Sequence, residues 1–124
     1  MRYIMLALIL VTSGYASAHE WLPTYPKMKQ SFIPGAYVTT MTLFNKRSDV
    51  EFYEIKVYDK DFNPVRFGTP KRVINLKYLK KTDVDVYIKH EDKSRALYIC
   101  SVSKLVAEKI TATAVSSRIC SKIK

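Results

Sequence analysis

Short runs in which apolar and polar residues alternate follow one another along the chain, and turn-forming residues separate them roughly every 8 to 15 positions. The clearest run covers residues 53–58, where Tyr53, Ile55 and Val57 alternate with two charged residues and a tyrosine. Residues 83–88 repeat this pattern, with three aliphatic side chains on one face. A period of two residues is the period of a β-strand that buries one face. Both runs are therefore expected to be strands.

Weaker runs complete the expected set of elements. Further strands are expected over residues 28–33, 39–43, 65–67, 95–102 and 110–115. Residues 73–79 fit either a strand or one helical turn, and the segment 103–108 fits a helical turn. Because only one stretch is long enough for a helix, a parallel sheet with helical crossovers is not expected.

These runs together predict the fold class. A chain of 124 residues has room for one domain, and an apolar fraction of 48% rules out a disordered chain. The pattern is typical of an all-β protein, a single immunoglobulin-like antiparallel β-sandwich of about seven strands. The expected core consists of the inward-facing residues of the runs, namely Met41, Leu43, Tyr53, Ile55, Val57, Val84, Val86, Ile88, Tyr98 and Cys100.

The first 18 residues have the features of a secretory signal peptide. Arg2 supplies a positive start, residues 4–11 form an apolar run too short to span a bilayer, and residues 16–18 (ASA) match the signal-peptidase pattern. We expect cleavage after Ala18, which leaves a β-sandwich domain over residues 19–124 in the periplasm or outside the cell. No later stretch is long enough to cross a membrane.

The two cysteines are interpreted in the light of this compartment. Two cysteines exclude a disulfide-dense miniprotein and a four-cysteine zinc site. In an oxidising compartment a bridge is the expected state of a cysteine pair. We therefore predict a disulfide between Cys100 and Cys120.

Residues 94–100 (SRALYIC) resemble the D-x-A-x-Y-x-C signature of immunoglobulin-fold domains. Ser94 stands in the aspartate position, and Tyr98 stands in the position of the tyrosine corner. The chain departs from antibody-type domains because it lacks a second cysteine on the second strand and a tryptophan on the third.

The order of features over residues 25–102 resembles the N-terminal domain of periplasmic pilus chaperones. The likeness rests on residues 41–45 (MTLFN), the strand at 53–58 and the proline-containing stretch 69–73. Those chaperones have two domains, and this chain has room for one. The resemblance implies a non-enzymatic, chaperone-like or structural module that binds a protein partner in the cell envelope or on an assembled particle. Residues 19–26 and 117–122 also resemble small exported proteins of tailed phages.

The same resemblance implies an anchor for a carboxylate or another anion. Pilus chaperones hold a client's C-terminal carboxylate with an arginine on the first strand and a lysine on the last. The matching positions fall near Lys29 and at Lys109, so the arginine is absent here.

One expected strand is a candidate for binding a partner by strand addition. Its residues, Ile110, Thr111, Ala112, Thr113, Ala114 and Val115, include no charge and no proline. An uncharged edge strand offers an open template to another chain. The alternative is an interior strand that is already paired on both sides.

The net charge of +10, or +9 once Arg2 is removed with the leader, favours anionic surfaces as additional partners. Lipopolysaccharide and phospholipid head groups are the expected examples. A nucleic-acid partner is not expected, because the basic residues are spread along the chain and an exported protein seldom meets a nucleic acid.

Candidate chemistry is sparse. Cleavage after Ala18 would make His19 the N-terminal residue, and its amine and imidazole together could chelate copper. The only other imidazole, His90, is expected at the opposite end of the sandwich. With two histidines and neither a G-x-S-x-G nor an H-E-x-x-H motif, neither an enzyme nor a cofactor is expected. A periplasmic copper-binding protein that uses His19 is the alternative to the protein-binding module.

Overall fold

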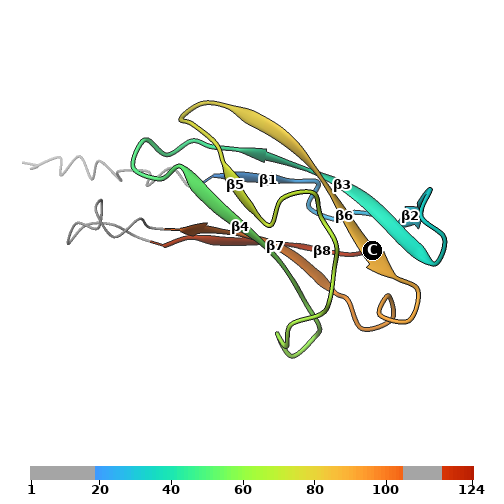
Figure 1. Cartoon of the computed structure of the whole chain (residues 1–124). Coiled ribbons are helices and arrows are strands. Elements are labelled where there is room, and N and C mark those ends of the chain that lie inside the picture. Colours follow the sequence, from blue (N-terminus) through green and yellow to red (C-terminus); the bar gives the residue numbers. More distant parts are fainter. Residues whose placement is uncertain (1–18, 105–115) are drawn as a thin grey trace, which may run out of the picture.

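The computed structural model describes residues 19–104 and 116–124, and every regular element in these two ranges is a β-strand. Eight strands form two antiparallel sheets that pack face to face (Figure 1). This architecture confirms the predicted all-β, immunoglobulin-like sandwich. No helix in these ranges is long and apolar enough to cross a membrane. The predicted leader at 1–18 lies outside the described residues.

The strands are short at the two ends of the chain and long in the middle. In chain order they are β1 (Glu20–Leu22), β2 (Lys29–Gln30), β3 (Ala36–Phe44), β4 (Phe52–Tyr58), β5 (Val73–Asn75), β6 (Lys81–Lys89), β7 (Tyr98–Lys104) and β8 (Arg118–Lys122). Of these, β1 and β8 were not predicted, because short strands with charged residues show no clear alternation.

The first sheet is built around β3. Along one side, β1 and β2 pair with the two ends of β3. Along the other side, β6 pairs with its whole length, from Ala36 opposite Lys89 to Phe44 opposite Lys81. The two longest strands, β3 and β6, therefore lie against each other, and β6 forms an edge of this sheet.

The second sheet has the order β5-β4-β7-β8. Cys100 and Cys120 stand directly opposite each other on β7 and β8 and form a disulfide, as predicted. The bridge joins neighbouring strands of one sheet, so it fastens the C-terminal strand to β7 rather than linking the two sheets.

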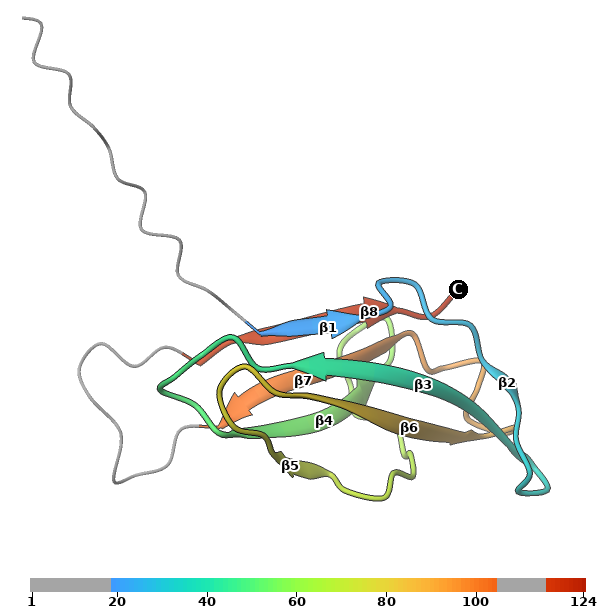
Figure 2. The same cartoon turned by 90° about the horizontal axis from the view of Figure 1, so that it is seen from above.

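The N-terminal segment closes one side of the sandwich. While β1 and β2 belong to the first sheet, the chain between them bonds to the end of the second. The amide of Lys122 donates to the carbonyl of Thr24, and that of Lys124 donates to the carbonyl of Pro26. Figure 2 shows β1 and β8 side by side here, with β5 on the opposite side of the molecule.

Most of the predicted core is confirmed, with an error of one residue on β7. All the predicted core residues on β3, β4 and β6 are buried. On β7, however, Ile99 belongs to the central cluster, whereas Tyr98 is partly exposed and stacks on Phe62 with ring centroids 4.8 Å apart. Cys100 is fully buried but lies in the bridge, outside that cluster.

Four expected elements differ in extent or type. Only Lys29–Gln30 of the expected strand 28–33 is formed, and residues 65–67 form no strand but lie between two isolated bridges at Pro64 and Gly68. The ambiguous segment 73–79 contains strand β5 followed by a turn. The helical turn expected at 103–108 is not found in its described part, because residues 103 and 104 complete β7. The strand expected at 110–115 lies outside the described residues.

Candidate partner-binding site

A buried polar cluster lies where β1 begins, between the end of β7 and the start of β8. Its centre is His19, which is only 2% exposed. The Nε2 atom of His19 lies 2.6 Å from Oγ of Ser101, and Nδ1 lies 3.2 Å from Oγ of Ser117. The imidazole also packs on the ring of Tyr53, with centroids 4.7 Å apart. His19 therefore joins β7, the start of the C-terminal segment and the core of the second sheet.

The same cluster ties the end of β7 to the residues that precede β8. The amide of Ser117 donates to Oγ of Ser103 at 2.7 Å, and the amide of Ser103 donates to the carbonyl of Ser117 at 2.8 Å. The residues that follow Lys104 and precede Ser116 include the predicted partner-binding residues 110–115, which lie outside the described ranges. The hydrogen bonds between Ser103 and Ser117 thus tie the end of the first described range to the start of the second.

The electrostatic state of His19 follows from its burial. Desolvation is the main cause that lowers its pKa from 6.5 to about 4; the backbone of Ser101 acts in the opposite direction, and the nearby charge of Arg47 lowers the pKa slightly further. The imidazole is therefore neutral at pH 7. Because Ser101 is completely buried, the His19–Ser101 pair is closed to a substrate and does not form an accessible nucleophile.

The contacts in this cluster compete with copper binding, since both ring nitrogens of His19 already lie within hydrogen-bond distance of serine hydroxyls. His90 lies at the opposite end of β3, against the ring of Tyr37. Within residues 19–104 and 116–124, no group of three or more histidine, cysteine or acidic side chains is placed to hold a metal ion. Copper binding by His19 stays a prediction.

Asn45 organises a second buried network beside the first, and sequence reasoning missed it because the residue looked like part of a polar turn. Its side-chain amide donates to the carbonyls of Val50 and Leu76, and its Oδ1 accepts from the Tyr53 hydroxyl and the Arg47 amide. Burial raises the pKa of Tyr53 to about 12, so the phenol stays protonated and keeps donating. This network joins the β3–β4 turn to the residue after β5.

The two predicted anion anchors are not brought together in the described residues. Lys29 lies exposed on β2, opposite Val38. Lys109 lies outside the described ranges. The clamp expected from the resemblance therefore stays a prediction.

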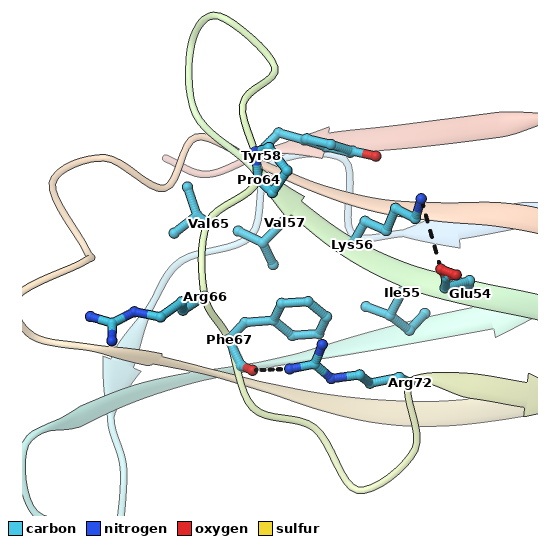
Figure 3. Close-up of a pocket in the computed structure, with 10 residues that line it drawn as sticks. All are labelled: Glu54, Ile55, Lys56, Val57, Tyr58, Pro64, Val65, Arg66, Phe67 and Arg72. Atoms are coloured by element: carbon cyan, nitrogen blue, oxygen red, sulfur yellow. Dashed lines mark hydrogen bonds and ion pairs between the residues drawn. The ribbon is translucent and has the colours of Figure 1, made fainter.

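A shallow pocket of about 400 Å³ lies between β4 and the segment 64–67 (Figure 3). Its cations already have partners. The Arg72 guanidinium lies 4.8 Å from the centroid of the Phe67 ring and donates to the Phe67 carbonyl, and Lys56 pairs with Glu54 at 3.8 Å. This arrangement stabilises the loop against β4 and presents no reactive group.

Comparison with known proteins supports the fold. No protein-family model and no curated protein matches the sequence. Among solved structures, the E. coli chaperone DraB matches with a TM-score of 0.62 at 16% identity, over 86% of this chain and 53% of that one. The chain thus spans about half the length of that chaperone, and the resemblance to tailed-phage proteins gains no support. The resemblance to a chaperone domain, predicted from residues 25–102, is confirmed at the level of the fold.

Proposed function

We propose that the chain is an exported, non-enzymatic protein-binding module that holds an extended segment of a partner in the cell envelope or on an assembled particle. The observation that carries this proposal is the sandwich fold shared with a chaperone. A β-sandwich has strand edges, and an extended segment that joins an edge gains main-chain hydrogen bonds along its length.

The proposed compartment is the periplasm or the exterior of the cell. Residues 1–18 would act as a cleaved leader, and residues 19–124 would be the working domain. The Cys100–Cys120 bridge supports this location, because disulfides persist in oxidising compartments.

The proposed binding element is the uncharged segment 110–115, with Lys29 and Lys109 as anchors for a carboxylate of the partner. Two observations support this assignment. The hydrogen bonds between Ser103 and Ser117 hold the flanks of the segment together, and β8, which follows it, is the last strand of the second sheet.

Affinity purification of the tagged full chain from its native cells tests the proposal. We expect one dominant protein to be recovered in both low and moderate salt, identified by mass spectrometry. A mixture that disappears as salt rises would instead assign the binding to the basic surface, because exposed charges are screened over about 8 Å at physiological ionic strength.

A pair of variants then tests the binding element. Ile110→Asp with Val115→Asp should abolish recovery of the partner, because two charges would have to enter the new sheet. The matched control, Ser48→Asp with Ser94→Asp, makes the same change of charge at exposed positions and should have no effect. Equal recovery with both double variants would show that residues 110–115 do not bind the partner.

A specific observation also favours an anionic surface as a second partner. The turn between β2 and β3 presents Phe32, which is fully exposed, and Ile33, which is 53% exposed. The hydroxyl of Ser31 fixes this turn by donating to the carbonyl of Ala36 at 2.7 Å. Lys89 lines the same hollow as Ile33, with Glu91 at its other side. An apolar tip beside a cation fits the boundary between head groups and acyl chains.

Sedimentation with vesicles tests this second partner. We expect the full chain to bind vesicles that contain phosphatidylglycerol or lipopolysaccharide more strongly than vesicles of phosphatidylcholine. Phe32→Ser should weaken binding about tenfold, the loss expected for one aromatic side chain that no longer leaves water. Tyr78→Ser, at an exposed position on the β5–β6 turn, is the matched control. Equal losses in both variants would contradict the role of the tip.

A further inference from the structure

The free edge of β6 presents backbone groups without partners. The amide of Asn45 donates to the carbonyl of Lys80, and the amide of His90 donates to that of Gly35, which fixes the hydrogen-bonded positions of the β3–β6 ladder. Because these positions alternate, the amides and carbonyls of residues 83, 85 and 87 point away from β3. The backbone groups of Tyr87 are paired, because its amide donates to the carbonyl of Gly68 and its carbonyl accepts from the amide of Gly68.

Asp83 and Asp85 are therefore left as an open stretch of this edge. Within residues 19–104 and 116–124, no backbone group pairs with theirs. The opposite side of the sandwich differs, since Thr24 and Pro26 accept hydrogen bonds from the end of the C-terminal segment there. An unpaired edge of this kind is a template for an added strand.

A groove of about 630 Å³ runs beside this open stretch, between β6 and β5. Val84 lines it from β6, and Ile74 and Leu76 line it from β5 and the residue that follows. These three side chains are buried or nearly so and give the groove an apolar wall. In Figure 2, β5 lies along the side of the sandwich away from β1 and β8.

The two open positions of β6 carry acidic side chains in a molecule of net charge +10, and Lys71 also lines the same groove. Oδ1 of Asp83 accepts from the Thr42 hydroxyl at 2.8 Å, and Oδ1 of Asp85 accepts from the Thr40 hydroxyl at 2.6 Å. These bonds hold both carboxylates on the outer face of the sheet. Among the described residues, neither carboxylate forms an ion pair with a lysine or arginine, although the net charge is +10.

We propose that this edge binds an extended segment of a basic protein, as a strand antiparallel to β6, with the pattern basic–apolar–basic. The two basic side chains lie beside Asp83 and Asp85 on the outer face, and the apolar side chain between them points into the groove next to Val84. The period of two in a strand matches the spacing of the two carboxylates. This proposal uses none of residues 110–115 and stands whether or not that segment binds a partner.

Peptide binding to the full chain tests the proposal. The probe is a blocked nine-residue peptide with Lys-Val-Lys at its centre and threonines on both sides, followed by fluorescence anisotropy. Asp83→Asn with Asp85→Asn should weaken binding at least about fivefold, since two exposed charge pairs are lost while the threonine bonds can persist. Asp61→Asn with Glu91→Gln removes the same charge from exposed positions elsewhere and should leave binding unchanged.

Two N-methylated peptides separate strand addition from simple charge attraction. In an antiparallel pair, the backbone amides of the two lysines face β6, and that of the valine points away. Methylation of the lysine amides should abolish binding, whereas methylation of the valine amide should not. Equal effects of the two methylations would overturn the proposal.

The amides of Asp83 and Asp85 provide a direct readout by NMR. On binding, both should become protected from hydrogen exchange, while the amides of β8 should not change. Protection that grows with protein concentration in the absence of peptide would assign the edge to a second copy of this chain and overturn the proposal. Peptide-induced changes confined to the Ser103–Ser117 region would overturn it too, and would point to the proposed site at 110–115.

Discussion

Acidification to pH 5 should destabilise the fold through one side chain, His19. This imidazole is buried, packs on Tyr53 and lies within hydrogen-bond distance of two serine hydroxyls, and its pKa is lowered from 6.5 to about 4. The unfolded chain therefore binds a proton near pH 6.5, whereas the native state resists protonation until about pH 4. Between these values the unfolded state holds more protons, so the free energy of unfolding falls as the pH falls.

The size of the effect follows from the two pKa values. Each pH unit between them is worth about 1.4 kcal/mol, so the complete loss is about 3 kcal/mol and the loss between pH 7.5 and pH 5 is about 2 kcal/mol. This is a large part of the stability of a small domain, which lies at about 5–15 kcal/mol. Acidic side chains contribute little in this window, since their unfolded pKa values lie near 4.

Urea unfolding of the full chain, followed by tryptophan fluorescence at pH 7.5 and pH 5, measures this loss. Trp21 is the single tryptophan and is buried, so its emission reports the native core. His19→Gln cannot take up a proton and should remove most of the pH dependence, whatever its own stability. His90→Gln, at an exposed position, should retain it. An unchanged pH dependence in His19→Gln would refute the assignment to this histidine.

Three further predictions concern stability and metal binding. Asn45→Ala should lower the free energy of unfolding by at least about 3 kcal/mol in urea, because it leaves two buried carbonyls and a buried phenol without partners. Replacing Cys100 and Cys120 by alanine should lower the free energy of unfolding by about 3 kcal/mol, the chain-entropy value for a loop of this length. The wild type should lose a similar amount of stability in reductant, and equal stability of the oxidised wild type and the variant would contradict the prediction. Cu(II) titration of protein with a free amine at His19 tests the copper alternative: the serine contacts of both ring nitrogens predict no tight site at pH 7, whereas tight binding that disappears in His19→Ala would support copper binding.

The long strands were predictable because each buries one face along most of its length. On β4 and β6, aliphatic or aromatic residues face the core at every second position, and polar residues face solvent. Local alternation is enough to identify such strands, since the free energy gained by burying each apolar side chain depends little on which neighbour covers it. The same reasoning identified the fold class before any pairing was known.

The short strands and the buried polar networks were not predictable in this way. On β7 the inward positions hold Ile99, Ser101 and Ser103, so the core face looks polar in sequence. Of the two residues expected there, Tyr98 is partly exposed and Cys100 is buried in the disulfide, outside the central cluster. Those serines are satisfied by His19 and Ser117, which lie far away along the chain. A buried polar group is tolerated only when its partner is in place, and that partner is chosen by the fold.

The sequence by itself therefore determined the class of the fold, the main strands and the cysteine pair, because apolar periodicity and cysteine spacing are local properties. The tertiary structure alone decided three other features. It closed one side of the sandwich with the chain between β1 and β2, buried His19, and left Asp83 and Asp85 on an open edge beside a groove. Each of these depends on backbone and side-chain partners that are distant in sequence. Hydrogen bonding between such partners produces no periodic pattern of residue types from which it could be predicted.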